Sequence, residues 1–423
     1  MIAVEKLENS IRDYDWGSPT ALAELLGHTP SGRPEAELWI GSHPAAPSRL
    51  MSDARSLTAV LKEDPEENLG AAVVASQPAD CVSLPFLMKV LSADAPLSLQ
   101  VHPDAQQAKA GFILEQSSGV PIDVPHRMYK DPRPKPEMIL ALTPFKALTG
   151  FRSAEQGIPA WEFLRGNTSR EETRTVANTV IEHLNHRDYK SALAYLVTGV
   201  DGIDAVVADA VQIIERDAET ARTVDALLPL LPWLNQKYPG DSGVLVSLLL
   251  NYVELEPGEA VALQAGNLHA YLHGTAVEVM GNSDNVLRCG MTSKYINVDE
   301  LMSIVRFASL EPTWVRPQQE KPGIELYSTE FDEFELVRIK GASSGDISLR
   351  GPACIIALSG NVTVRGADGT QIQLGRGESA FIPASAGGLS IEADEDAHAY
   401  LCATPLNRQT ASAASGSSAT VTR

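Results

Sequence analysis

The chain has 423 residues, of which 44% are hydrophobic and 21% charged, and its formal net charge is −20. This composition is typical of a globular protein and excludes a disordered or fibrous one, and the length predicts two or three domains. Because the chain is so acidic, its general surface is a poor match for nucleic acid or an anionic membrane. An anionic substrate would need a few well-placed Lys or Arg side chains.

The cysteines are far apart in the sequence and form no CxxC motif: Cys81, Cys289, Cys354 and Cys402. Their spacing argues against a disulfide framework, a zinc ribbon or an iron–sulfur site, and it suits a reducing compartment. The first eight residues lack the basic flank and apolar run of a signal peptide, and the apolar stretches are too short to span a bilayer. We therefore expect a cytoplasmic protein.

Taken in chain order, the sequence predicts a mainly β fold with a helical insertion. The first part is rich in Pro and short apolar runs, as in a β domain with many turns. Apolar residues three and four apart predict helices over 171–184 and 203–214. The predicted regions are 1–152 (β-rich), 153–240 (helical), 241–312 (β-rich), 313–405 (strands with Gly turns) and 406–423 (a disordered tail of small polar residues).

A faint internal repeat links the two later β regions. Residues 255–265 (LEPGEAVALQA) and 374–384 (LGRGESAFIPA) each indicate a strand, a Gly turn and a second strand. When they are aligned without gaps, His269 falls opposite Gly388. If both segments belong to copies of one β-barrel unit, the first copy kept a metal-capable side chain and the second lost it. We therefore expect His398, the one histidine of the last β region, to be structural.

The segment PLSLQVHPD (residues 96–104) alternates strictly between apolar and polar residues. On a strand, Ser98, Gln100 and His102 would share the polar face. Gln100 and His102 would then point the same way, two residues apart, and could reach one ion. A strand with one solvated face is the alternative interpretation.

Two further segments place polar side chains on apolar strands. In KPEMILAL (residues 135–142), Lys135 and Glu137 share a face, and the buried carboxylate needs a metal or the lysine as its partner. In AGNLHAYL (residues 265–272), a Gly-Asn turn feeds His269 into the interior, with Tyr271 on the same face. The alternatives are an ion pair at a strand edge and a core histidine with satisfied hydrogen bonds.

Together, the three strands offer a set of four ligands: Gln100, His102, Glu137 and His269. Two imidazoles, one carboxylate and one amide oxygen suit zinc, although iron, manganese or cobalt could also occupy such a site. The set carries a single negative charge, so a divalent ion would keep a net positive charge. Such an ion remains a Lewis acid with a position open to water.

A polar run follows the third strand directly, over residues 278–294. Small and turn-forming residues surround Glu278, Asp284, Arg288 and Lys294 there. In an acidic protein, Arg288 and Lys294 beside a metal predict an anion pocket, because Arg can clamp a phosphate or an enediolate through two parallel hydrogen bonds. A solvated loop is the alternative.

These segments belong to longer motifs that occur in one order: YDWGS (14–18), AELWIGSHP (36–44), PFLMKVLSA (85–93) running into PLSLQVHPD, HAYL (269–272) and SDNVLRCGMTSK (283–294). In this respect the sequence resembles the type I mannose-6-phosphate isomerases, also called phosphomannose isomerases. The match covers most of the chain, and several long motifs in the right order are far more specific than any single one.

The resemblance implies two cupin-type β-barrels with a helical insertion and a single zinc ion. Residues 1–152 and 241–312 would form the catalytic cupin domain, and residues 313–405 a cupin-like domain without metal. The four ligands named above occupy the family's zinc positions. Arg288 occupies the position of its catalytic arginine, and Lys135 is the lysine of its KPE motif.

One departure from the family lies just before KPE. The family carries Asn-His there, whereas this chain has Arg133 and Pro134. A histidine has been proposed in the family to assist opening of the sugar ring, and proline cannot do acid–base chemistry. His126 and Arg133 are the candidates for taking over that role.

The resulting hypothesis is interconversion of mannose 6-phosphate and fructose 6-phosphate through an enediol. The metal and Arg288 would stabilise the developing oxyanion, and Lys135 or Glu278 would move the proton. Lys135 is plausible as a base only if the nearby cation lowers its pKa. The expected substrate-binding residues are Trp16, Ser98, Tyr271, Asp284 and Lys294.

The expected partner is a sugar phosphate, without nucleic acid or membrane, in a monomer or weak homo-oligomer. Two alternatives from other classes remain open. One is a cupin metalloenzyme of redox type, such as an iron dioxygenase. The other is a non-catalytic cupin that binds or stores sugar phosphates.

Overall fold

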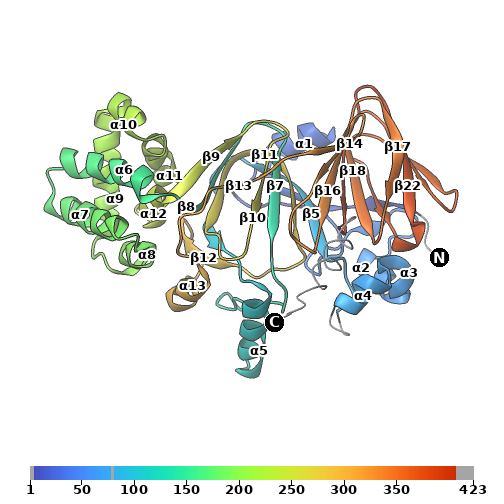
Figure 1. Ribbon diagram of the computed structural model, residues 1–423, viewed down its shortest axis with the longest axis horizontal. Coiled ribbons are helices and arrows are strands. Elements are labelled where there is room, and N and C mark those ends of the chain that lie inside the picture. Colours follow the sequence, from blue (N-terminus) through green and yellow to red (C-terminus); the bar gives the residue numbers. More distant parts are fainter. Residues whose placement is uncertain (1–3, 78–80, 406–423) are drawn as a thin grey trace, which may run out of the picture.

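The computed structural model describes residues 4–77 and 81–405. In this part of the chain, antiparallel sheets fill the middle and one end of an elongated molecule, and a helical region forms the other end (Figure 1). A mixture of strands and one contiguous helical region is what the sequence predicts.

The central sheet has eleven strands in the described part of the chain, and it carries the residues expected at the functional site. Its strands are β2 (Ser10–Arg12), β3 (Glu37–Ile40), β5 (Phe86–Ala93), β6 (Leu99–Val101), β7 (Glu137–Ala141), β8 (Phe145–Phe151), β9 (Leu250–Leu255), β10 (Ala260–Leu263), β11 (His269–Gly281), β12 (Leu287–Gly290) and β13 (Thr313–Val315). Residues of β5 and β7 are buried throughout, which explains their continuous apolar runs.

The long strand β11 sets the register of the site. Its first residue, His269, lies opposite Gln100 of β6. Near its other end, Glu278 lies opposite Lys89 of β5, and Met280 lies opposite Glu137 of β7. One strand therefore aligns polar residues that are far apart in the sequence.

Two smaller sheets form the other end of the molecule. The eight-stranded sheet contains β1 (Glu5–Glu8), β4 (Arg49–Leu50), β14 (Gln318–Lys321), β15 (Ile324–Tyr327), β16 (Glu335–Lys340), β18 (Ala353–Ser359), β21 (Ser379–Ile382) and β23 (His398–Ala403). The four-stranded sheet contains β17 (Ser343–Ser348), β19 (Val362–Gly366), β20 (Gln371–Leu374) and β22 (Gly388–Ala393). Strand β1 pairs with β21, so the beginning of the chain is built into the sheet formed mainly by its end.

The predicted repeat appears in both β regions as a strand, a Gly turn and a strand. β9 and β10 flank Gly258, and β20 and β21 flank Gly377. Both glycines have positive φ angles, 91° and 79°, in the left-handed region that favours glycine. The next strands after these pairs begin at His269 and at Gly388, the two positions that the alignment placed opposite each other.

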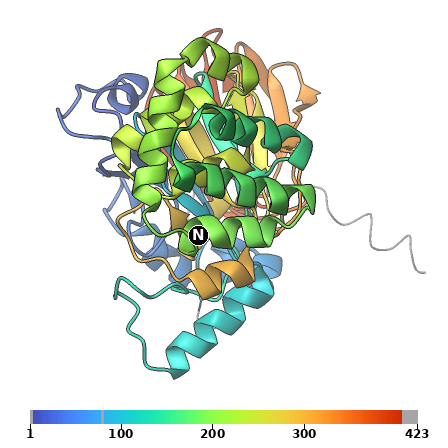
Figure 2. The same ribbon diagram turned by 90° about the vertical axis from the view of Figure 1, so that its left-hand side faces the viewer.

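The helical region covers one end of the central sheet (Figure 2). It consists mainly of α6 (Ala154–Asn167), α7 (Glu171–Asn185), α8 (Tyr189–Thr198), α9 (Ile203–Arg216), α10 (Ala218–Val224), α11 (Leu231–Lys237) and α12 (Gly243–Val246), with 3₁₀ turns at Leu228–Leu230 and Ser247–Leu249. The helices predicted over 171–184 and 203–214 are confirmed as α7 and α9. Their apolar faces share one core with Leu99 of β6 and Leu287 of β12, so the helices support these two strands from behind.

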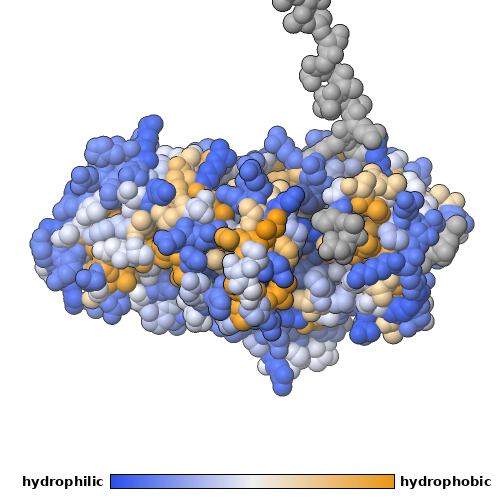
Figure 3. Space-filling view, turned by 90° about the horizontal axis from the view of Figure 1, so that it is seen from below, coloured by the Kyte–Doolittle hydropathy of each residue, from blue (hydrophilic) through white to orange (hydrophobic). Residues whose placement is uncertain are grey.

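The helices outside this region are α1 (Ala21–Leu26), α2 (Leu57–Glu63), α3 (Pro65–Leu69), α4 (Ala71–Ser76), α5 (Ala105–Ser117) and α13 (Val298–Ile304), with a 3₁₀ turn at Ala384–Ala386. α5 projects from the body of the molecule (Figure 1) and leaves Ile113 and Leu114 exposed. Seen from below, hydrophobic side chains gather near the middle of the face, within a largely hydrophilic periphery (Figure 3).

No single helix of the described residues has the length and hydropathy needed to cross a membrane. The pair α8 and α9 passes the criterion only when taken together, and the two helices meet at an angle of 106°.

A close backbone approach joins the helical region to β12. A Cβ atom added at Gly290 would lie 2.7 Å from the Cα of Gly243, the first residue of α12. We expect Gly290→Ala to lower the free energy of unfolding by about 1–3 kcal/mol, because backbone on both sides must move. The measurement is the denaturation midpoint of both proteins in urea.

The matched control is Gly166→Ala near the end of α6, where an added Cβ meets nothing within 4 Å. Because alanine is the better helix former, this variant should be neutral or more stable by up to about 1 kcal/mol. A Gly290→Ala protein as stable as Gly166→Ala would contradict the close approach.

Candidate metal centre and anion pocket

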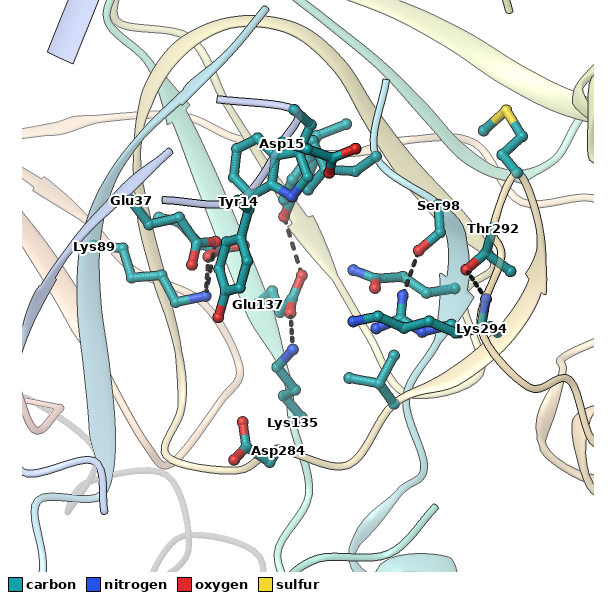
Figure 4. A pocket seen from close by; sticks show the side chains of 18 of the residues that line it. Tyr14, Asp15, Glu37, Lys89, Ser98, Lys135, Glu137, Asp284, Thr292 and Lys294 are labelled. Atoms are coloured by element: carbon teal, nitrogen blue, oxygen red, sulfur yellow. Dashed lines mark hydrogen bonds and ion pairs between the residues drawn. The ribbon is translucent and has the colours of Figure 1, made fainter. Parts of the chain in front are cut away.

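A cavity of about 360 Å³ opens beside β6, β11 and β12 (Figure 4). The predicted site residues that line it are Trp16, Ser98, Gln100, Lys135, Glu137, Tyr271, Glu278, Asp284, Arg288 and Lys294. Ser98 and Lys294 lie on one side, Glu37 and Lys89 on the other, and Glu137 with Lys135 between them (Figure 4). The segments therefore converge on one cavity.

Glu137, which lines this cavity, forms a buried group with His102 and His269 behind the cavity wall, and the potential ligand atoms of the three all lie within 4.8 Å of one another. Nε2 of His102 is 3.1 Å from Oε1 of Glu137, and Nε2 of His269 is 3.4 Å from Oε2. All three side chains are buried. Two imidazoles and a carboxylate at this spacing form a donor set for a divalent transition metal.

The hydrogen bonds of the two imidazoles determine which nitrogen faces the centre. Nδ1 of His102 donates to the carbonyl oxygen of Asn285 at 2.8 Å, and Nδ1 of His269 donates to that of Asn267 at 2.9 Å. A carbonyl can only accept, so in the neutral rings each Nε2 presents a lone pair to Glu137. Burial is the main cause that lowers the pKa of His102 to about 4, so the ring is neutral near pH 7.

This arrangement is unfavourable unless a cation lies between the acceptors. Nε2 of His102 is buried and forms no hydrogen bond, although it lies near the Glu137 carboxylate. A buried acceptor facing another acceptor costs free energy that a shared metal ion would remove. The residues present therefore fit a divalent cation.

Gln100 completes the predicted set. Its carboxamide nitrogen is placed 3.4 Å from Nε2 of His269. Because the two ends of an amide are nearly equivalent in shape, a half-turn of the group would present its oxygen to the same point. Gln100 also lies opposite Arg288 in the pairing of β6 with β12, which brings the metal centre and the anion pocket together.

Lys135 and Tyr271 surround the Glu137 carboxylate. Nζ of Lys135 is 3.0 Å from Oε1, and the Tyr271 hydroxyl donates to Oε2 at 3.0 Å. Burial disfavours the charged form of Glu137, but Lys135 and His102 outweigh it and hold the pKa of this carboxyl well below its ordinary value. The pair is buried, so it differs from the strand-edge ion pair considered as an alternative.

Three charged residues that sequence reasoning missed or placed differently meet beside the metal centre. Nζ of Lys89 is 2.9 Å from Glu278 and 3.4 Å from Glu37, and the Trp39 indole donates to Glu37 at 2.7 Å. Burial disfavours the Lys89 ammonium, but the two carboxylates outweigh it and raise the pKa of Lys89. Glu278 lies in β11 rather than in a loop, and burial raises the pKa of its carboxyl. The sequence does contain a signal for Lys89 and Glu278, because a charged residue inside an apolar strand needs a partner of opposite charge.

The anion pocket is formed by Arg288 and Lys294 at the side of the cavity. The Arg288 guanidinium donates to the Ser98 hydroxyl, and burial is the main cause that lowers its pKa. Burial and the repulsion of Arg288 also lower the pKa of Lys294. Within residues 4–77 and 81–405, neither cation forms an ion pair with a carboxylate, so both can receive a bound anion.

Loops near the cavity are held by Asn285, another residue that sequence reasoning missed. Its Oδ1 accepts from the backbone of Lys130 at 2.8 Å, and its Nδ2 donates to the carbonyls of Asp131 and Arg133 at 2.7 and 2.9 Å. Since its own carbonyl accepts from His102, Asn285 ties the loop before Glu137 to a metal ligand.

The two candidates for the role of the family histidine do not line the cavity. The Arg133 guanidinium donates to Ser83, to the carbonyl of Asn282 and to the Cys81 thiol. His126 is exposed and lies edge-on to Tyr295, with ring centroids 6.4 Å apart. The structure therefore assigns neither of them to the cavity.

Asp284 reaches the cavity while it pairs with the buried His43. Ala45 donates its backbone N–H to Nδ1 of His43, so Nε2 carries the proton and faces the Asp284 carboxylate at 3.3 Å. Trp16 stacks on Tyr14 with ring centroids 5.8 Å apart, and both line the opening.

The pairing of Asp284 with His43 predicts a pH dependence of stability. Burial opposes ionisation of Asp284, but His43 outweighs it and lowers the pKa to about 2. A carboxyl with a lowered folded pKa stabilises the fold above its unfolded pKa of about 4, and this contribution is lost as the pH falls toward about 2. Because the side chain is 37% exposed, we expect about 1 kcal/mol after solvent screening.

The measurement is urea unfolding of the unaltered protein and Asp284→Asn at pH 6, 4 and 3. The difference in unfolding free energy should be largest at pH 6 and shrink toward pH 3. His43→Gln should remove the same dependence. A difference that stays constant over this range would contradict the assignment.

Comparisons with known proteins agree with this geometry. The family model described as phosphomannose isomerase type I, catalytic domain, matches residues 4–154. Mannose-6-phosphate isomerase of Escherichia coli strain K12 is 37% identical over 394 residues, covering 90% of this chain and 95% of that protein. Mannose-6-phosphate isomerase 1 of Arabidopsis thaliana is 34% identical over 422 residues, covering 90% and 89%.

A solved structure shows the same fold. The crystal structure of mannose 6-phosphate isomerase bound with zinc and yttrium superposes with a TM-score of 0.81 at 33% identity, and covers 96% of this chain and 100% of that chain. Relatives of more than 30% identity match nearly the full length, and the motifs converge on one cavity. The chain therefore belongs to the type I phosphomannose isomerase family.

Proposed function

We propose that this chain interconverts mannose 6-phosphate and fructose 6-phosphate, with one zinc ion as cofactor. The observation that carries the proposal is that the buried group of His102, Glu137 and His269 reaches, through Glu137, the cavity that Arg288 and Lys294 also line. A sugar phosphate has hydroxyl groups for the metal centre at one end of the cavity and a phosphate for the anion pocket at the other. The proposed reaction is that of the type I phosphomannose isomerase family, to which the chain belongs.

Gln100, His102, Glu137 and His269 would hold the metal. When bound, a divalent cation supplies Lewis-acid stabilisation for negative charge that develops on the oxygen atoms of the sugar. The aromatic and polar walls of the cavity, including Trp16 and Tyr271, would enclose the sugar chain.

The anion pocket would bind and orient the substrate. Lys294 and Ser98 would contact the phosphate, together with one face of the Arg288 guanidinium. Arg288 lies between this pocket and the metal centre, so it is also suited to stabilise negative charge on the enediol. Asp284, held by His43, would accept a hydrogen bond from a sugar hydroxyl.

Lys135 is our choice for the group that moves the proton between C1 and C2. It points into the cavity beside Glu137, next to the proposed metal centre, where the sugar would bind. Both candidates are ion-paired, Lys135 with Glu137 at 3.0 Å and Glu278 with Lys89 at 2.9 Å, but only the partner of Lys135 is a proposed metal ligand. Glu278 would then act as a positioning residue for Lys89.

We also propose a division of the chain into two cupin barrels. The central sheet would form the catalytic barrel from residues 1–152 and 241–312, interrupted by the helical region 153–240. Residues 313–405 would form a second cupin-like barrel without metal, to which β1 and β4 are added, although β13 at the start of this range pairs with β10 of the central sheet. The disordered tail predicted for 406–423 lies outside the described residues. A cytoplasmic location and a monomer or weak homo-oligomer stay predictions from the sequence.

A coupled assay for fructose 6-phosphate, run with a measurement of bound metal, tests the function. We expect isomerase activity that is lost on metal removal and returns with zinc. Activity that is unchanged in metal-free protein would contradict the proposal. Sugar-phosphate binding without turnover would favour a storage cupin, and an absolute requirement for iron with oxygen uptake would favour a dioxygenase.

A further inference from the structure

A second hollow adjoins the cavity described above. It has a volume of about 520 Å³, against about 360 Å³ for the first, and the two share Tyr14, Asp284, Val286, Arg288, Ser293 and Lys294. Its other walls come from the loop after α5 and the loop before α13. The shared residues include both cations of the anion pocket, so this pocket lies between the two hollows.

The second hollow adds a further cation. Lys130 lines it, is exposed, and forms no ion pair within residues 4–77 and 81–405. It lies near enough to Lys294 to repel its charge. Two carboxylates line this hollow: Asp284 faces His43 at 3.3 Å, and Asp123 lies on the loop after α5. Lys130, Arg288 and Lys294, none of which forms an ion pair among the described residues, therefore outnumber the two carboxylates of the hollow, in a chain with a net charge of −20.

The far wall of the second hollow has a different character. Val124, Pro125 and Met128 line it, together with Tyr295, a residue that is 54% exposed. Arg127 also lines it, but its guanidinium is occupied by Glu115 at 3.0 Å and by the carbonyls of Val120 and Tyr129. The hollow thus offers an apolar and aromatic surface beyond a strip of positive charge.

A hexose phosphate does not account for this hollow. With its sugar at the metal centre and its phosphate at Arg288 and Lys294, such a substrate ends where the second hollow begins. A ligand that occupies both must be extended through its phosphate. A diphosphate matches the three cations, and a flat, weakly polar group matches the aromatic wall.

We propose that the second hollow binds a nucleoside diphosphate, with the diphosphate on Lys130, Arg288 and Lys294 and the base against Tyr295. A bound nucleotide would occupy Arg288 and Lys294 and so exclude the phosphate of the sugar substrate. This consequence rests on the proposed function. The enzyme would accordingly be inhibited competitively by nucleoside diphosphates.

The experiment measures binding of ADP and of inorganic pyrophosphate to the zinc-loaded protein by calorimetry. We expect ADP to bind about tenfold more tightly than pyrophosphate, because stacking of the base adds to the diphosphate contacts. Tyr295→Ala should remove this difference and leave pyrophosphate binding unchanged. Lys130→Ala should weaken both ligands by about tenfold. ADP and pyrophosphate also chelate zinc, but this affects all variants alike. Differences in affinity between the variants therefore report on binding in the second hollow.

The control is Lys62→Ala, which removes an exposed lysine of α2 and should bind both probes like the unaltered protein. Equal affinities for ADP and pyrophosphate in the unaltered protein, no measurable binding of ADP, or a Lys130→Ala protein that behaves like Lys62→Ala would each overturn the inference. In the isomerase assay, ADP should raise the apparent KM without changing kcat. Absence of isomerase activity would refute the proposed function, whereas the calorimetric arms would still decide whether the hollow binds ADP.

Discussion

His102→Ala and His269→Ala should each lower isomerase turnover by roughly a thousandfold and reduce bound zinc to a small fraction of one ion per chain. Each variant removes one imidazole from a set whose lone pairs converge on Glu137. Losing the cation removes Lewis-acid stabilisation of several kcal/mol, and about 4 kcal/mol corresponds to a thousandfold in rate. Metal analysis and steady-state kinetics on the same preparations provide the measurement.

His273→Ala is the matched control, because His273 lies on the same strand as His269 but is exposed. It should keep both zinc and activity. Circular dichroism on all three variants would establish that they are folded. If either buried histidine could be removed with zinc content and turnover intact, the metal centre would have to lie elsewhere.

Arg288→Ala should lower kcat by about 10²–10³, the loss usually caused by removing one preorganised donor from a developing oxyanion. KM for the sugar phosphate should rise as well, because the same guanidinium faces the proposed phosphate position. Arg288→Lys keeps the charge but loses the two-pronged donor, so its activity should lie between those of the unaltered protein and Arg288→Ala. Steady-state kinetics of both variants separate the two effects.

Arg316→Ala serves as the control for a lost guanidinium. Arg316 is 72% exposed and lies 3.6 Å from Glu259, a surface ion pair that contributes about 0–1 kcal/mol. Its loss should leave both kinetic constants unchanged. An Arg288→Ala enzyme with a kcat within threefold of the unaltered protein would rule out a role of Arg288 in the chemical step.

The residues of the metal cluster could be predicted because strands alternate. Side chains two apart share a face, so Gln100 and His102 were paired from the sequence alone. What alternation cannot provide is the neighbouring strand. That β6 lies between β11 and β12 follows from long-range pairing, which leaves no local pattern. The resemblance to the family implies the same four ligands, but it does not specify which strands pair.

Other parts of the site depend on partners that no local pattern indicates. Lys89 is flanked by apolar residues on its own strand, and its carboxylate partners lie 52 residues before it, at Glu37, and far after it, at Glu278. Asn285 looks like an ordinary loop residue, yet it ties a metal ligand to the loop before Glu137. Such roles arise from tertiary contacts and need coordinates to be seen.

The pairing of β1 with β21 affects how this protein folds during its synthesis. Lys6 and Glu378 form an ion pair across 372 positions of sequence, so β1 is synthesised long before its partner β21. During that delay the edge of β1 is free to meet other chains. Contacts of such sequence separation slow folding, and a fragment ending before residue 379 would lack β21, one of the two strands that pair with β1, and keep only β4. The protein is therefore most prone to aggregation during its synthesis, before β21 is available to pair with β1.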